Sequence, residues 1–140
     1  MKKISVLLAV LLSVTLIFAS CAPSYSWQDA ENDVERLKEI GFEVYIENTQ
    51  ETLEELTESL NKQLARDGED FTVEFVNVCG LVINKYEVIV FEEYATEKQA
   101  KRIYDYYRGY TIDMKYVLFG KILISTDTQE AIDLLGYDFQ

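Results

Sequence analysis

The stretch Tyr86-Glu87-Val88-Ile89-Val90-Phe91 decides the fold of this chain. Successive side chains of a strand point to opposite faces of a sheet, so a strand with one buried face alternates apolar and polar residues. The four residues from Val88 to Phe91 are all apolar instead. The pattern therefore predicts a strand buried on both faces, at the centre of a sheet rather than at its edge.

The segments on either side of this strand alternate between the helical and the strand period. One apolar stripe at helical spacing, with a capping residue or a glycine stop, predicts helices at 27–40, 48–67, 96–109 and 126–136. Alternation or a short apolar run predicts further strands at 42–46, 71–75, 112–118 and 122–125. Residues 76–83 are mostly apolar, and the pattern leaves open whether the second strand continues or Gly80 interrupts it with a bulge or turn.

The order of these elements contains a strand-helix-strand unit twice. Because such crossovers are right-handed, both crossing helices are expected on one face of the sheet. The sequence thus predicts an α+β fold, a ferredoxin-like two-layer sandwich with an antiparallel sheet, plus an N-terminal and a short C-terminal helix. In that topology the first and third strands are central. The fold hosts carriers, inhibitors, RNA binders and enzymes, so it does not predict a function.

The N-terminus has the layout of an export signal. Lys2 and Lys3 form a basic start, 4–19 is almost wholly apolar, and small residues precede Cys21. In its sequence Phe18-Ala19-Ser20-Cys21 the segment resembles the type II signal peptide of bacterial lipoproteins. The resemblance implies cleavage before Cys21 and a diacylglyceryl group on the Cys21 thiol. An uncleaved anchor, or an ordinary export signal followed by a chance cysteine, is the alternative.

This resemblance divides the chain into a signal peptide at 1–20, a lipidated cysteine with a tether at 21–26, and one α+β domain at 27–140. It implies that the lipid on Cys21 holds the domain on the extracytoplasmic face of a bacterial cell membrane. The segment 22–26 spans less than about 20 Å when extended, so the domain is expected to stay close to the membrane.

The composition argues against several classes of function. The chain has 140 residues with 25 acidic and 13 basic side chains, a net charge of −12, and no histidine. An acidic protein is repelled by phosphate backbones, so no nucleic-acid partner is expected. Without histidine the usual general base and metal ligand are missing, and we expect no metal, no cofactor and no enzymatic activity. With Cys21 lipidated, Cys79 is the one remaining cysteine, and its apolar neighbours indicate a packing role.

The third predicted helix carries the candidate contact residues. Arg102, Tyr106 and Arg108 are expected at its outer side, and Tyr and Arg are enriched where proteins meet, although ordinary packing explains them as well. The second helix has an acidic face, for which solvation is favoured over a docking face for a cationic partner or a weak divalent-cation site. That face consists of Glu51, Glu54, Glu55 and Glu58. Basic residues of the third helix are expected to compensate the negative charge of the neighbouring second helix. The alternative is that the two helices form oppositely charged patches through which copies or partners associate.

The sequence therefore predicts a lipid-anchored extracytoplasmic binding or accessory protein. Its expected partners are the membrane, through Cys21, and an envelope protein or further copies of the chain. One alternative is a structural module that self-associates through an exposed sheet edge. A less favoured alternative is an enzyme that uses carboxylates or tyrosines.

Overall fold

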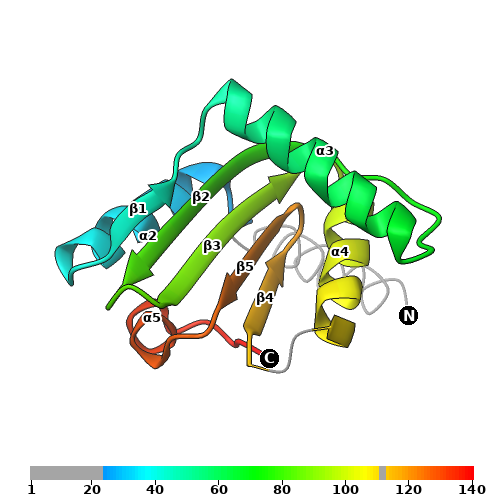
Figure 1. Ribbon diagram of the computed structural model, residues 1–140. Coiled ribbons are helices and arrows are strands. Elements are labelled where there is room, and N and C mark those ends of the chain that lie inside the picture. The colour runs from blue at the N-terminus through cyan, green and yellow to red at the C-terminus, as the bar shows by residue number, and fades with distance from the viewer. Residues whose placement is uncertain (1–23, 111–112) are drawn as a thin grey trace, which may run out of the picture.

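A five-stranded antiparallel sheet with helices around it makes up the computed structural model, which describes residues 24–110 and 113–140 (Figure 1). The predicted signal peptide at 1–20 and Cys21 lie outside the described residues, as does Ile112 of the predicted fourth strand. In chain order the elements are α2 (Trp27–Glu39), β1 (Glu43–Ile46), α3 (Gln50–Arg66), β2 (Phe75–Ile83), β3 (Glu87–Tyr94), α4 (Glu97–Tyr110), β4 (Lys115–Phe119), β5 (Ile122–Thr126) and α5 (Gln129–Leu135).

Strand β3 lies at the centre of the sheet. The strand order is β1-β2-β3-β5-β4, and each neighbouring pair is antiparallel. Ile89 and Phe91 are fully buried, and Val90 on the opposite face is half-buried. The prediction of a central strand is confirmed, and the strand continues three residues beyond its predicted end, to Tyr94.

The predicted ferredoxin-like strand order is wrong. That order requires β1 in the middle of the sheet, whereas β1 lies at an edge and pairs with β2. The physical reason is its surface, because Glu43, Val44 and Tyr45 are exposed and do not supply the two apolar faces of a central strand. The place beside β3 goes to β2, which a tight turn with positive φ at both Asn84 (53°) and Lys85 (70°) joins directly to β3.

The apolar run at 76–83 belongs to strand β2. The strand begins at Phe75, where the predicted strand at 71–75 was expected to end, and it continues to Ile83. Gly80 does not end the strand. A Cβ atom on Gly80 would lie 2.8 Å from Cδ1 of Ile46, so the missing side chain provides the space in which Ile46 of β1 packs.

Helices cover both faces of the sheet. α2 and α5 pack on the face that carries Ile89, Phe91 and Ile124, which we call the α2 face. α3 and α4 form a second apolar cluster with Tyr116 and Leu123 on the opposite side, which we call the α4 face. In Figure 1, α3 crosses one end of the sheet and α4 lies to the side of β4. Large parts of β2 and β3 on the α4 face therefore have no helix above them, and their valines at 82, 88 and 90 are half-buried.

Helices α3 and α5 begin later than the predicted ranges 48–67 and 126–136. Thr49, rather than Asn48, caps α3. The Asn48 side chain instead accepts a hydrogen bond from the backbone N of Val78 in β2, at 3.1 Å. Thr128, rather than Thr126, precedes α5, because Thr126 belongs to β5.

The two outer strands offer little free backbone for pairing with another sheet. The backbone N of Tyr116 in β4 donates to the carbonyl oxygen of Gln140 at 3.0 Å, and the backbone N of Gln140 donates back at 2.8 Å. β1 at the other edge has only four residues, begins with Glu43 and is followed by Glu47. Short and charged edges discourage pairing between molecules.

Candidate functional site

The α4 face contains a hollow of about 200 Å³ above the middle of the sheet. Strands β3, β4 and β5 form its floor, and α4 and the segment before β4 form its wall. It is lined by Val90, Glu92, Tyr107, Met114, Tyr116 and Ser125. A larger depression of about 590 Å³ lies between α3 and the start of β2, but both acids that line it, Glu54 and Glu74, are exposed. The smaller hollow is the better candidate because its polar groups are buried.

Glu92 is the acidic group of this hollow, and only 8% of it is exposed. Its Oε2 accepts a hydrogen bond from the hydroxyl of Tyr94 at 3.1 Å, and its Oε1 accepts a longer one from Tyr107 at 3.4 Å. Burial raises the pKa of the Glu92 carboxyl to about 7, although the two tyrosine hydrogen bonds offset part of the rise. Near neutral pH the side chain therefore exists in both its neutral and its ionised form.

Ser125 is the second buried polar group. It lies opposite Val90 of β3 and Tyr116 of β4, and 5% of it is exposed. Within the described residues its Oγ has no hydrogen-bond partner. A buried hydroxyl without a partner costs about 1–3 kcal/mol, which a ligand atom in the hollow would recover. Ser125 Oγ is therefore not hydrogen-bonded to Glu92.

Tyr45 of β1 is influenced by the charge in the hollow. The pKa of Tyr45 in that strand is raised, first by partial burial and then by the negative charges of Glu92 and Asp127. Tyr45, of which 50% is exposed, is therefore within electrostatic range of the hollow. Half-buried valines of β2 and β3 lie on the same face of the sheet.

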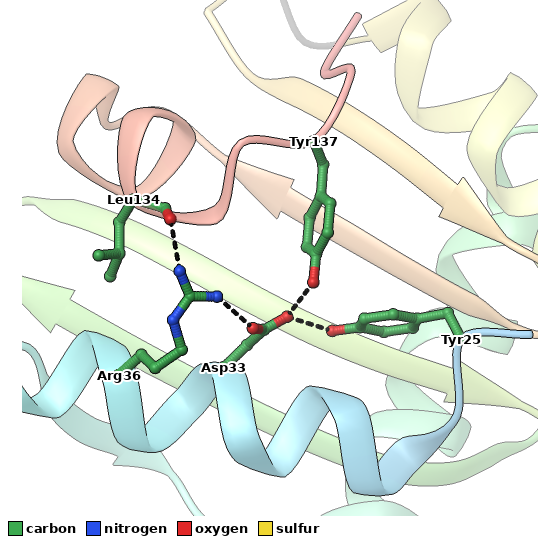
Figure 2. Close-up of polar contacts among 5 residues, drawn as sticks. All are labelled: Tyr25, Asp33, Arg36, Leu134 and Tyr137. Carbon is green, nitrogen blue, oxygen red and sulfur yellow. Dashed lines mark hydrogen bonds and ion pairs between the residues drawn. The ribbon is translucent and has the colours of Figure 1, made fainter. Parts of the chain in front are cut away.

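A second cluster of polar groups lies on the α2 face, around Asp33 (Figure 2). Only 4% of Asp33 is exposed, and its Oδ2 accepts hydrogen bonds from the hydroxyls of Tyr25 at 2.8 Å and Tyr137 at 2.6 Å. Its Oδ1 pairs with Arg36 at 3.0 Å, and the same guanidinium donates to the carbonyl oxygen of Leu134 at 2.7 Å. We call Tyr25, Asp33 and Tyr137 the clamp, because they join three separate segments of the chain.

Aromatic packing reinforces the clamp. The Tyr25 ring stacks on Phe119 at a centroid distance of 4.6 Å, and Tyr137 meets both rings edge-on. Burial and the bond to Asp33 raise the pKa of Tyr25, and the same two causes raise the pKa of Tyr137 to about 12. Both hydroxyls therefore remain donors to Asp33 across the physiological pH range. The clamp fixes the chain four residues after Cys21 and connects it to the C-terminal segment.

The predicted contact residues of α4 bind within the chain. Arg102 pairs with Asp70 at 2.5 Å and stacks on the ring of Phe71. The hydroxyl of Tyr106 donates to Asp67 at 2.5 Å, which together with partial burial raises the pKa of Tyr106 to about 12. Basic and aromatic groups of α4 thus meet the acidic turn after α3, as the expected charge compensation across the layer requires.

Arg108 is the most exposed of the three predicted contact residues. Its guanidinium donates to the hydroxyl of Tyr104 at 3.2 Å and lies over that ring. Tyr110 nearby is 62% exposed. Of the predicted contact surface, this end of α4 is therefore the part that is exposed to solvent.

Neither Cys79 nor the acidic face of α3 has the features of a reactive or ligand-binding site. Cys79 is a free thiol packed against the core on the α2 face, and burial raises its pKa, so it is poorly nucleophilic. The four glutamates of α3 point to solvent. The described residues contain no group of three or more acidic or cysteine side chains that could hold a metal ion. Among the helices of 24–110 and 113–140, none is long and apolar enough to cross a membrane.

Comparison with protein-family models, curated proteins and solved structures gives no match for this chain. The candidate site therefore stands on its geometry alone.

Sequence reasoning missed the residues of both clusters. Glu92 follows the apolar run of β3, and the alternation Val90, Glu92, Tyr94 would have placed it on a buried face if the strand had been extended. Asp33 falls beside the apolar stripe of α2, where an acid within a buried surface is a detectable signal. Its tyrosine partners lie 8 and 104 residues away from it in the sequence, and no local pattern predicts the contact with Tyr137.

Proposed function

We propose that this chain is a lipid-anchored extracytoplasmic binding protein, attached through Cys21 and carrying its binding site in the hollow on the α4 face. The observation that supports this most strongly is the position of the clamp relative to the hollow. Tyr25 packs with Phe119 on the α2 face, whereas Glu92 and Ser125 lie on the opposite face of the sheet. Anchoring through the N-terminus therefore leaves the hollow accessible.

The clamp limits how far the domain extends from a lipid on Cys21. Tyr25 is the fourth residue after Cys21, so the connection reaches about 14 Å when extended. Such a short connection holds the end of the molecule around Tyr25, Gly120 and Lys121, which line one shallow depression together, next to the membrane. A ligand would reach the hollow from the side, along the envelope.

Self-association through a sheet edge has less support. The outer edge of β4 is partly occupied by Gln140, and β1 is short and flanked by acids. A partner that docks on Arg108 and Tyr110 at the exposed end of α4 is compatible with the binding function and uses a different surface.

The anchoring half of the proposal is tested by metabolic labelling with an alkyne fatty acid in a bacterial host. We expect the wild-type chain to be labelled and to sediment with membranes. Cys79→Ala, the matched control at the other cysteine, should behave in the same way, whereas Cys21→Ala should lose the label. Label on Cys21→Ala, or none on the wild type, would contradict the proposal.

A further inference from the structure

The hollow on the α4 face combines a buried acid with an unpartnered hydroxyl. We infer that it binds the positively charged head of a small alkylammonium ligand, with the Glu92 carboxylate and Ser125 Oγ as acceptors. This inference rests on the proposed binding function and names the class of ligand.

The charge of the hollow selects a cation. The titratable groups around Glu92 are tyrosines: Tyr94 on its own strand, Tyr107 from α4 and Tyr116 from β4, with Tyr45 of β1 within electrostatic range. Within the described residues, no lysine or arginine forms an ion pair with Glu92. A buried carboxylate without a counter-charge is costly, and a bound cation supplies that charge. An anionic ligand would be repelled.

The acceptors fit an ammonium group. An alkylammonium head carries three N–H donors and no acceptor. The hollow offers carboxylate oxygens on β3 and a hydroxyl oxygen on β5 that has no other partner among the described residues. Both groups are more than nine-tenths buried, so their hydrogen bonds to a ligand would be shielded from water.

The size and the walls of the hollow suit a short alkyl chain. A volume of about 200 Å³ corresponds to roughly seven water molecules at about 30 Å³ each. The rings of Tyr107 and Tyr116 stack at a centroid distance of 6.1 Å, and Met114 and Val90 add apolar surface. Aromatic rings also attract cations. The hollow therefore fits an ammonium head with a few methylene groups.

The test is a calorimetric titration of the full chain with n-butylammonium. The protein is purified in a non-ionic detergent from whichever cell fraction contains it. The matched neutral probe is 1-butanol, which has the same chain length. A ligand this small is expected to bind with a Kd of about 1 mM. Because the pKa of Glu92 is about 7, affinity should be about tenfold higher at pH 8 than at pH 6. Binding near pH 7 should also release a proton, which buffers of different ionisation enthalpy detect.

Substitutions connect the binding to the hollow. Glu92→Gln keeps the shape of the side chain and removes its charge, and should weaken the binding of n-butylammonium at least about tenfold. Ser125→Ala should weaken the binding about threefold. Glu43→Gln, at an exposed acid of the same sheet, should have no effect. A denaturation curve of each variant checks that it is folded.

Several outcomes would overturn the inference. They are no saturable binding, equal affinity for 1-butanol, equal affinity at the two pH values, or full retention of binding in the Glu92→Gln and Ser125→Ala variants. If Glu92→Gln does not fold, Ser125→Ala and the pH dependence of the wild type still decide. Loss of the lipid label on Cys21 would refute the anchoring without touching this titration, so the two failures are distinguishable.

Discussion

Replacing Asp33 by alanine tests whether the clamp holds the N-terminal segment to the domain. The change removes the acceptor of two tyrosine hydroxyls and the partner of Arg36. Removing one member of a buried, charge-assisted network costs about 3–5 kcal/mol when the remaining groups stay buried. Tyr25 and Tyr137 are half-buried and Arg36 is exposed, so water can solvate them in part. We therefore expect the free energy of unfolding to fall by about 2–4 kcal/mol.

The assay is urea unfolding at pH 7, followed by fluorescence of the single tryptophan, Trp27, which lies two residues after Tyr25. For a chain of this size the loss corresponds to a Tm lower by about 8–16 °C. The matched control is Asp133→Ala, at an exposed acid of α5 whose side chain accepts one bond, from Gln129. It should change stability by less than about 0.5 kcal/mol. If Asp33→Ala were as stable as this control, the clamp would not hold the segment and its proposed role would be refuted.

Three further perturbations test other parts of the structure. Gly80→Ala brings a Cβ to 2.8 Å from Cδ1 of Ile46 and should destabilise by about 1–3 kcal/mol, and Ile46→Ala in the same chain should relieve part of that loss; strictly additive losses in urea unfolding would contradict the packing. The pKa of Glu92 is raised from 4.5 to about 7 in the folded state, so the folded protein binds the extra proton between these values. Unfolding free energy should therefore fall by on the order of 3 kcal/mol as the pH rises from about 4.5 to 7, and Glu92→Gln should lack this component; the same pH dependence in both chains would be the opposite result. Arg102→Ala breaks a pair with Asp70 that is largely exposed and should cost less than about 1 kcal/mol by thermal unfolding, whereas a larger loss would mean that the pair carries more of the α3–α4 contact than its exposure indicates.

Local patterns predicted most of the helices and strands. The apolar stripe of α2 and the two-faced run of β3 locate these elements correctly, because periodicity depends on which side of an element is buried. Caps were less predictable, since Asn48 and Thr49 are both good cap residues and a tertiary bond to Val78 decides between them.

Strand order and the candidate site depend on distant contacts. The repeated strand-helix-strand unit suggested a ferredoxin-like order, but the length of β2 and the exposed surface of β1 produce a different one. Arg102 and Tyr106 were identified as surface residues, and their partners in the acidic turn emerge only from the packing of α4 against that turn. Glu92 lies at the end of a strand whose predicted range stopped one residue earlier. Its burial depends on α4 and β4, which follow later in the chain.

The intact mass of the protein purified from the membranes of a bacterial host tests the central claim most directly. Our account predicts a chain that begins at Cys21, with a mass increased by a diacylglyceryl group on that residue, and with the Cys79 thiol unmodified. A chain that retains residues 1–20, or one that begins at Cys21 or beyond without a lipid, would contradict the account.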